Sequence, residues 1–451
     1  MQFLKKLVNK HTLSLASNAI MPVMGMVTVS LLARNMPPPK PDFGDWILFL
    51  ISYTIVNFSR SGFLQTSLIK FCSGASKERA ATVIGSTWML GLCMAALVGL
   101  ASLLGYIFYE GAPTTEIIIK WFGIIFFSTL PSSVALWVLQ AEERFDRIFI
   151  LQAIGQGTFF VSVIVLMVLH LNHFQDVIYA FCISAIITSV FSLVSGWAKL
   201  STIRHKSWDC MKQLANFGKF SLGTSVSSYL LRGSDTYIIQ FMFANPAIVG
   251  VYYLPQRLME VIEIPLRSFI ATALPAMSAA VHQNDKRQMT YIMKKYAGIL
   301  TILLIPVSIV AFLSADVIIR LLGGAQFSHS AAANVFRIFM TFAILLPIDR
   351  FLGVTLDILN KPHINMIKVI LMLVVNIIGD FVGIYLTHNL YGVALSSIFT
   401  FLAGIVYGYW MLKKNLEFKM RDMIILGFNE TILIAKVLFS RIKGKKTTVE
   451  S

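Results

Sequence analysis

The chain has 451 residues, of which 56% are hydrophobic and only 13% are charged, and its mean hydropathy is +0.73. The charged fraction is about half the ~25% of an ordinary soluble domain, which excludes a soluble globule, a disordered chain and a collagen-like fibre. A net charge of +16 could suit a nucleic-acid-binding protein, but its distribution along the chain favours another explanation. The composition predicts a polytopic membrane protein.

Twelve apolar segments follow one another along the chain, and each is long enough to cross a bilayer as a helix. They are continuously apolar rather than alternating, which favours helices over the strands of a membrane barrel. The loops between them leave no room for a soluble domain. We expect an all-α polytopic protein with spans near residues 11–33, 45–70, 80–109, 116–139, 148–170, 177–198, 218–243, 249–281, 291–314, 332–357, 364–387 and 389–412.

Lysine and arginine are distributed very unevenly between the two sets of loops. The set that includes both termini holds 28 of them, and the opposite set holds 4. Because cytoplasmic loops carry an excess of Lys and Arg, this predicts that both termini are cytoplasmic. The same bias accounts for most of the net charge, so no nucleic-acid partner is expected. The basic residues before the first span predict a retained signal-anchor rather than a cleaved signal peptide.

The two halves of the chain are weakly alike, and chance similarity of apolar sequence is the alternative to a repeat. Phe43-Gly44-Asp45-Trp46 matches Val249-Gly250-Val251-Tyr252, and Arg60 and Arg267 follow at similar spacing. A parallel repeat of six spans would place the substrate between two lobes near the bilayer midplane. We expect an N-terminal six-helix lobe over 1–198, a cytoplasmic basic linker over 199–217, a C-terminal six-helix lobe over 218–412 and a basic cytoplasmic tail over 413–451.

Within the tail, the apolar stretch 423–439 is short and contains Asn429, Glu430 and Lys436. Basic residues flank it on both sides, which is typical of a helix that lies in the membrane interface. The sequence therefore predicts an interfacial helix, with a thirteenth span as the alternative.

No motif for catalysis or metal binding is present in the sequence. Walker A, G-x-S-x-G and H-E-x-x-H patterns are absent, and His170 and His173 lie near an outer span end where polar residues are ordinary. The four cysteines have no metal-ligand spacing, and their places predict no disulfide. We therefore expect a protein that is not an enzyme and uses no metal or cofactor.

Charged residues inside the spans are the most informative feature. A charge at the bilayer centre costs at least about 2.5–3.5 kcal/mol, so it is expected to face a wet cavity or a partner. All the intramembrane basic residues are arginines, whose planar fork suits phosphate or carboxylate, and the lysines lie in loops or at span ends. The arginines are Arg60, Arg232, Arg257, Arg267, Arg337 and Arg350.

Acidic residues near these arginines support a structural alternative, in which ion pairs hold helices together. Arg257 and Glu260 are three residues apart, and Glu263 and Arg267 are four apart, so each pair can meet on one helix face. Arg60 has no acid within four positions and is the strongest candidate for ligand contact. The predicted substrate-binding residues are Arg60, Arg232, Arg257 and Arg267, and the candidate cavity or coupling charges are Asp235, Glu260, Glu263, Asp349, Arg350 and Asp380.

The eighth span combines charges with prolines. Pro255, Pro265 and Pro275 predict a broken helix, and its four charges, at 257, 260, 263 and 267, form a stripe along one face of roughly 15 Å. Such a stripe favours a cavity lining over contact with lipid. A salt-bridged seam against a neighbouring helix is the alternative.

Several short stretches resemble the multidrug/oligosaccharidyl-lipid/polysaccharide (MOP) exporter superfamily, in particular bacterial polysaccharide flippases of the O-antigen (Wzx) type. The resemblance covers all twelve spans. It rests on the order and spacing of Phe43-Gly44, Val249-Gly250-Val251-Tyr252, Ala273-Leu274-Pro275-Ala276-Met277-Ser278, Leu322-Gly323-Gly324 with Phe327, and Asn360-Lys361-Pro362. The D-R-x-G-R-type signature of the major facilitator fold is missing from residues 72–79. The first span lacks the acid that multidrug antiporters of the superfamily carry there.

The resemblance implies a MATE-like MOP fold and a central cavity lined by spans 1, 2, 7 and 8. It implies flipping of a polyprenyl-diphosphate-linked oligosaccharide across the bacterial inner membrane, with a polysaccharide polymerase or glycosyltransferases as further candidate partners. Three alternatives stay open. They are a cation-coupled antiporter of drugs or small metabolites with Asp380 as its protonation site, a membrane-embedded scaffold or polymerase-associated subunit, and an integral enzyme.

Overall fold

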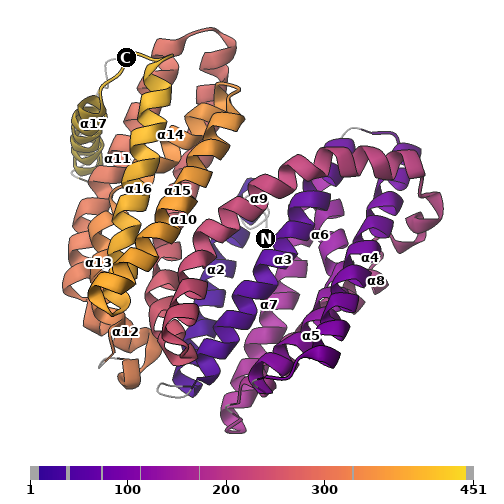
Figure 1. Cartoon of the computed structure of the whole chain (residues 1–451). Coiled ribbons are helices and arrows are strands. Elements are labelled where there is room, and N and C mark those ends of the chain that lie inside the picture. The colour runs from indigo at the N-terminus through magenta and orange to yellow at the C-terminus, as the bar shows by residue number, and fades with distance from the viewer. Residues whose placement is uncertain are drawn as a thin grey trace. The chain divides into compact units, whose positions relative to one another are not determined.

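The computed structural model describes residues 10–36, 41–72, 75–111, 113–171, 173–327 and 330–442, which form helices and turns without a β-strand (Figure 1). The helices gather into two compact units. Unit 1 comprises Met1–Tyr253 with Leu322–Gln326, and unit 2 comprises Leu254–Leu321 with Phe327–Ser451. The chain first passes from one unit to the other inside helix α10. The lobe limits expected from the sequence, at residues 198 and 218, stay a prediction.

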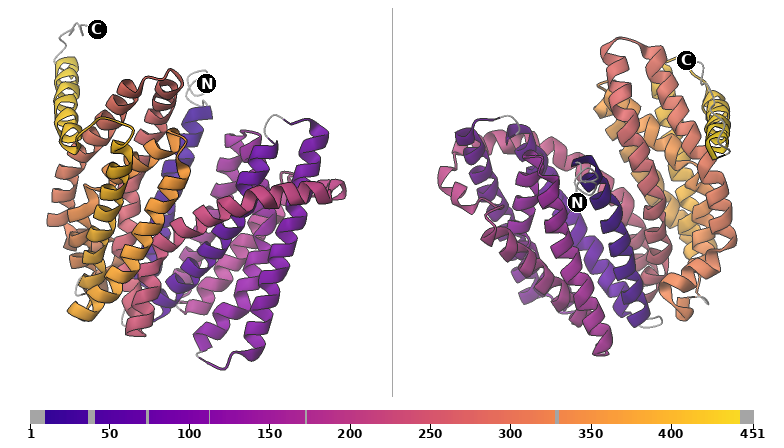
Figure 2. Two further views of the ribbon diagram at one scale, coloured as in Figure 1. Left: turned by 45° about the horizontal axis from the view of Figure 1, so that its top comes forward. Right: turned by 180° about the vertical axis from the view of Figure 1, so that it is seen from behind.

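Unit 1 contains long helices joined by short turns, and α9 lies alongside α3 (Figure 2). A Cβ atom on Gly62 of α3 would lie 2.4 Å from Ser225 Oγ, and one on Gly218 of α9 would lie 2.3 Å from the Phe63 carbonyl oxygen. The two glycines therefore allow this close packing. The elements are α2 (Lys10–Asn35), α3 (Asp42–Cys72), α4 (Lys77–Phe108), α5 (Pro113–Ser128), α6 (Leu130–Ala141), α7 (Phe145–Val168), α8 (Phe174–Val194), the 3-10 helix η1 (Leu200–His205), α9 (Trp208–Phe243) and the start of α10 (Pro246–His282).

Unit 2 is built around an apolar core that includes Met289, Met293, Phe351 and Leu352, all almost fully buried. Within a bilayer, such packing is stabilised mainly by van der Waals contact between the closely fitting side chains. Its elements are the rest of α10, then α11 (Lys286–Leu313), α12 (Ala315–Gly323), α13 (Ala332–Ala343), α14 (Leu346–Ile358), α15 (Pro362–Thr387), α16 (Leu390–Lys413) and α17 (Met420–Ile442).

Each of the twelve predicted spans overlaps one helix or one bent pair of helices. Eight of the described helices are long and apolar enough to cross a membrane, or up to ten if the bent pairs α5–α6 and α13–α14 each form one span. The apolar part of α2, Ile20–Asn35, is shorter, and α9 carries Arg232 and Asp235 and is not among the eight. The all-α membrane fold is therefore confirmed, whereas the count of twelve and the cytoplasmic termini stay predictions.

Helix α10 differs from the expected broken helix. It runs as one helix over 37 residues with Pro255, Pro265 and Pro275 inside it. Proline removes one backbone hydrogen bond, but membrane helices tolerate this loss because neighbouring groups and local adjustments satisfy the freed carbonyl. The prolines therefore do not divide this helix.

Helix α17 includes the tail stretch for which the sequence predicted an interfacial helix. It packs directly against α11, and a Cβ atom on Gly427 would lie only 2.2 Å from the Gly298 carbonyl carbon. Glu430 forms an ion pair with Lys295 at 2.7 Å and accepts a hydrogen bond from the Tyr291 hydroxyl at 2.7 Å. Small residues therefore let the backbones of α17 and α11 meet, and the placement of α17 in the membrane interface stays a prediction.

Candidate functional site

Arg60, the strongest sequence candidate, lies inside unit 1 with no exposed surface. Its NH1 donates to the Phe126 carbonyl oxygen at 2.8 Å, and its guanidinium carbon lies 4.3 Å from the centre of the Phe126 ring. Its NH2 is within 2.6 Å of Asn57 Oδ1, 3.1 Å of Thr129 Oγ1 and 2.9 Å of Ser133 Oγ. In this structure Arg60 is thus enclosed by protein groups, and its contact with a ligand stays a prediction.

The surroundings of Arg60 follow from the bend between α5 and α6. The two helices meet at Thr129 at an angle of 40°, with Pro131 in the first turn of α6. Because proline has no N–H, the helical hydrogen bonds are interrupted there and carbonyl groups become available. Arg60 and the Thr129 hydroxyl both donate to the Phe126 carbonyl, in the last turn of α5. None of its four acceptors is a carboxylate, so Arg60 is held by neutral groups. For this reason no acidic residue near Arg60 in the sequence indicates its partners.

The other predicted residues of unit 1 lie on α9. Arg232 is exposed, whereas Asp235 is buried and accepts a hydrogen bond from the Tyr252 hydroxyl at 2.6 Å. Tyr252 belongs to the Val249-Gly250-Val251-Tyr252 stretch, which the sequence singled out for a possible internal repeat and for its resemblance to a family. The hydrogen bond to Asp235 gives Tyr252 a structural role.

Unit 2 holds the charges of α10 in ion pairs. Arg257 pairs with Glu260, and Arg267 NH2 lies 3.0 Å from Glu263 Oε2, so both spacings predicted from the helix period form pairs. Arg350 of α14 joins the second pair, with its NH2 3.5 Å from Glu263 Oε1. The sequence did not link Arg350 to Glu263, because the contact connects positions 87 residues apart.

The cluster of Glu263, Arg267 and Arg350 has one more positive than negative charge. The Glu263 side chain is 15% exposed, whereas those of Arg267 and Arg350 are 61% and 40% exposed. A single carboxylate therefore orients two accessible guanidinium groups, which are the donors best suited to bidentate contact with phosphate oxygens. We call these three residues the arginine cluster.

A second ion pair of unit 2 is almost completely buried. Lys368 Nζ of α15 lies 2.6 Å from Asp349 Oδ1 of α14 and donates to the Asp349 backbone carbonyl at 2.8 Å. The sequence placed Lys368 at a span end and found no lysine within the membrane, but its side chain is 3% exposed. The signal that could have found it is its position inside the predicted span 364–387.

Asp380 of α15 is fully buried within unit 2. Its Oδ1 accepts a hydrogen bond from Asn376 Nδ2 at 3.3 Å and another from the Ser396 hydroxyl of α16. Among the described residues, no group of three or more His, Cys, Asp or Glu side chains could hold a metal ion.

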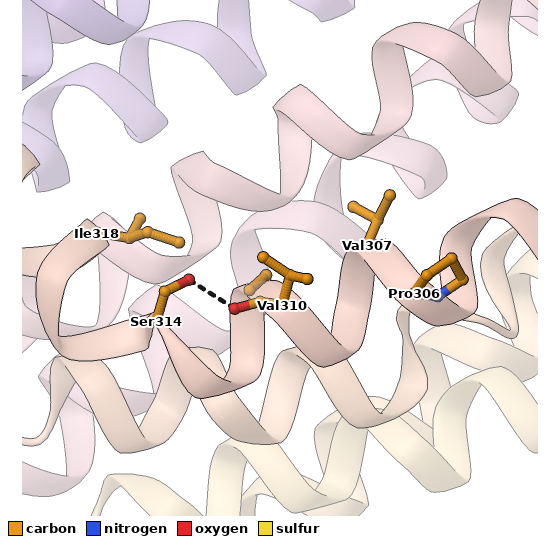
Figure 3. A pocket seen from close by; sticks show the side chains of 6 residues that line it. Pro306, Val307, Val310, Ser314 and Ile318 are labelled. Carbon is orange, nitrogen blue, oxygen red and sulfur yellow. Dashed lines mark hydrogen bonds between the residues drawn. The ribbon is translucent and has the colours of Figure 1, made fainter.

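A surface hollow of about 390 Å³ lies where α11 ends and α12 begins (Figure 3). It is lined by Pro306, Val307, Val310, Ala311, Ser314 and Ile318. The Ser314 hydroxyl donates to the Val310 carbonyl at 2.6 Å, as the dashed line shows. The lining therefore offers no charged group to a phosphate, and the hollow adds nothing to the candidate site.

The predicted residues are therefore distributed over both units. Arg60, Arg232 and Asp235 belong to unit 1, and Arg257, Glu260, Glu263, Arg267, Asp349, Arg350 and Asp380 belong to unit 2. Within unit 2 the structure brings Glu263, Arg267 and Arg350 together, whereas Asp349 turns to Lys368 instead. A single cavity shared by the four candidate arginines stays a prediction.

Comparison with solved structures relates the whole chain to transporters. A multidrug resistance transporter of the MATE family and MOP superfamily, in an inward-facing conformation, matches with a TM-score of 0.71 and 14% identity over 95% of this chain and 99% of its own. The lipid II flippase MurJ, in an inward closed conformation, matches with a TM-score of 0.73 and 14% identity over 96% and 93%. A MOP superfamily transporter from Pyrococcus furiosus matches with a TM-score of 0.63 and 16% identity over 89% and 95%.

These likenesses show the fold, and they confirm the MATE-like MOP architecture expected from the sequence. No curated protein sequence matches the chain. A family model described as polysaccharide biosynthesis protein matches residues 31–332, which is more than half of the chain. The chain therefore belongs to this polysaccharide biosynthesis protein family.

Proposed function

We propose that this protein is a flippase that moves a polyprenyl-diphosphate-linked oligosaccharide from the cytoplasmic to the periplasmic leaflet of the bacterial inner membrane. Its membership of a polysaccharide biosynthesis family supports a sugar-bearing substrate. Its likeness in fold to a lipid II flippase supports movement of a lipid-linked molecule across the bilayer. In this proposal the two units alternate in giving access to the cytoplasm and to the periplasm.

The arginine cluster is the observation that carries the proposal. A diphosphate bears negative charges on oxygen atoms that are arranged to accept paired hydrogen bonds from a guanidinium group. Arg267 and Arg350 are accessible, and Glu263 holds both of them at 3.0 and 3.5 Å. Because one carboxylate cannot neutralise two guanidinium groups, the cluster favours an anion.

The remaining candidates have different parts in this proposal. Arg257 is paired with Glu260, and Arg232, which is exposed on α9, stays a candidate for contact with the substrate. Arg60 is occupied by Asn57, Phe126 and the hydroxyls of Thr129 and Ser133. We therefore propose that Arg60 positions the bend between α5 and α6 and does not touch the diphosphate in this conformation.

Transport into vesicles tests the proposal. The purified chain would be reconstituted with a short polyprenyl diphosphate carrying a fluorescent sugar, and translocation would be followed by protection of the sugar from a quencher that cannot cross the membrane. We expect movement of the diphosphate-linked sugar and much slower movement of the same sugar on an uncharged polyprenyl ether. Equal rates for both substrates, or no movement of either, would contradict the proposal.

A cation-coupled antiporter of drugs or small metabolites is the second candidate function, and the burial of Asp380 favours it. Such a transporter needs a carboxyl group that alternately binds and releases a cation during the cycle. Uptake of a cationic dye into vesicles with an imposed proton or sodium gradient measures this activity. Loss of that uptake in Asp380→Asn, together with inactivity toward the diphosphate-linked sugar, would favour the antiporter.

A further inference from the structure

The tryptophans of this chain divide into enclosed and exposed residues. Of the seven, Trp208 and Trp410 are the two that are largely exposed, at 66% and 55%. Each is followed four residues later by a lysine whose ammonium group lies over the indole ring. The distance from the ammonium nitrogen to the ring centre is 5.7 Å for Lys212 over Trp208 and 4.0 Å for Lys414 over Trp410. We call these the two Trp–Lys pairs.

The first pair lies at the start of α9 in unit 1. The stretch before it is fixed to α4, because the Trp88 indole donates to the Ala198 carbonyl at 2.8 Å and a Cβ atom on Gly85 would lie 2.0 Å from the Thr202 carbonyl oxygen. In the first turns of α9, Cys210 and Leu214 point into the protein, so Trp208 and Lys212 lie on the opposite, exposed face. Trp208 is therefore exposed on a helix whose opposite face is packed against the protein.

The second pair lies at the end of α16 in unit 2. Leu412, which lies between Trp410 and Lys414 in the sequence, is fully buried. The ammonium nitrogen of the adjacent Lys413 lies 5.9 Å from the ring centre of Tyr409. The helix end is held in place because Lys361 Nζ donates to Asn415 Oδ1 at 2.8 Å. This end therefore presents two lysines, each beside an aromatic ring, on a fixed backbone.

The surroundings of both pairs are positively charged on balance. Arg204 and Lys206 precede Trp208 and are exposed, and Asp209 is the acid in that stretch. Lys413 and Lys414 follow Trp410, with Glu417 as the acid beyond them. Both pairs also fall at helix ends that the distribution of Lys and Arg assigns to the cytoplasm.

We propose that the two Trp–Lys pairs bind the phosphate groups of anionic phospholipids at the cytoplasmic surface of the bilayer. Tryptophan is favoured at the level of the headgroups, where its ring contacts acyl chains and its N–H stays near water. The cation–π contact holds the lysine ammonium beside the ring, where the lipid phosphate lies. Anionic lipid would then fix α9 and α16 at that surface, one in each unit.

The expected effect is moderate and measurable. A basic residue near an anionic membrane surface contributes about 1 kcal/mol of attraction, which corresponds to about a fivefold preference for anionic lipid per lysine. This preference does not depend on the substrate. Binding of anionic lipid can therefore be measured on a protein that carries no diphosphate-linked sugar, and its outcome is separate from that of the proposed function.

Quenching of tryptophan fluorescence by brominated lipids tests the proposal. The full-length chain would be reconstituted into phosphatidylcholine vesicles that contain brominated phosphatidylglycerol or, at the same mole fraction, brominated phosphatidylcholine. The emission of the two exposed tryptophans is obtained by subtracting the emission of Trp208→Phe/Trp410→Phe from that of the natural chain. We expect brominated phosphatidylglycerol to quench this emission more strongly, and Lys212→Gln/Lys414→Gln to lose most of that preference.

The matched control is Lys77→Gln/Lys286→Gln, which removes two exposed lysines from other ends that the sequence assigns to the cytoplasm. It should keep the preference for phosphatidylglycerol. Equal quenching by the two lipids in the natural chain would overturn the proposal, as would an unchanged preference in Lys212→Gln/Lys414→Gln. Quenching by iodide dissolved in the water, without quenching by either brominated lipid, would show that the tryptophans face the cytoplasm. This result would also overturn the proposal. If the phenylalanine variant fails to insert, total emission of the natural chain and the lysine variants gives the same comparison.

Discussion

Lys368 and Asp349 form an ion pair with 2.6 Å between Nζ and Oδ1, and both side chains are less than 5% exposed. Gly404 of α16 makes room for it, since a Cβ atom there would lie 2.8 Å from Asp349 Oδ1. The pair therefore links α14 and α15 at a point where α16 approaches closely. We therefore expect the pair to be structural, and a role of Asp349 as a cavity or coupling charge stays a prediction.

Removing one partner of this pair should destabilise the protein strongly. Lys368→Met leaves the Asp349 carboxylate buried without its cation, and such a change costs about 3–5 kcal/mol. Lys368→Met/Asp349→Leu removes both charges and should recover most of that loss. Thermal unfolding of the purified variants in detergent measures the effect. A Tm for Lys368→Met equal to that of the natural chain would show that the pair contributes nothing to stability.

The close contact of α17 and α11 predicts that Gly427→Ala lowers stability. The new methyl group would lie 2.2 Å from the Gly298 carbonyl carbon, so the helices must separate. Gly157→Ala on α7 is the matched control, because nothing lies within 4 Å of its added methyl group. Alanine in a helical position with open space for its methyl group should raise stability slightly. If both variants unfold at the same temperature, α17 does not pack on α11 as described.

Arg60 is expected to behave as a structural residue. Lysine keeps the charge but cannot reach the Phe126 carbonyl, Asn57 and Ser133 at once, so Arg60→Lys should unfold at a lower temperature than the natural chain. Arg232→Lys, at an exposed position, should leave the unfolding temperature unchanged. The two measurements distinguish positioning from ligand contact. Unchanged stability of Arg60→Lys with lost transport would instead assign Arg60 to the substrate.

The expected orientation predicts the behaviour of reporter fusions. A reporter that is active only outside the cytoplasm should be active when fused after residue 175 or 246, and silent when fused after 206 or 286. The reason is the excess of Lys and Arg in the set of loops that includes both termini, to which residues 206 and 286 belong. The opposite pattern would reverse the orientation, and a mixed pattern would contradict the count of twelve spans.

The helices could be predicted from the sequence because long apolar segments have few alternatives in a membrane. The pairs of α10 could be predicted too, since Glu263 and Arg267 are separated by one helical turn. Contacts between distant positions could not. Arg350 meets Glu263 because α14 packs beside α10, and Lys368 meets Asp349 because α14 packs beside α15. The periodicity of one segment does not show which other segment packs against it.

The partners of Arg60 could not be predicted from the sequence either. The absence of a nearby acid in the sequence suggested a wet cavity, because a buried charge needs compensation. In the structure that compensation comes from a backbone carbonyl, an amide and two hydroxyls. Neutral groups of this kind are common in every span, so their convergence on one arginine leaves no signal in the sequence.

The rate at which Arg267→Gln/Arg350→Gln translocates a polyprenyl-diphosphate-linked sugar, per inserted molecule, tests the central claim most directly. Each guanidinium–phosphate contact is worth about 1.5–3 kcal/mol, so the account predicts a loss of at least about tenfold for the double variant. Arg337→Gln removes an arginine that pairs with Asp316 elsewhere in unit 2 and should keep the natural rate. A double variant that inserts normally and translocates as fast as Arg337→Gln would contradict the claim that the arginine cluster binds the diphosphate.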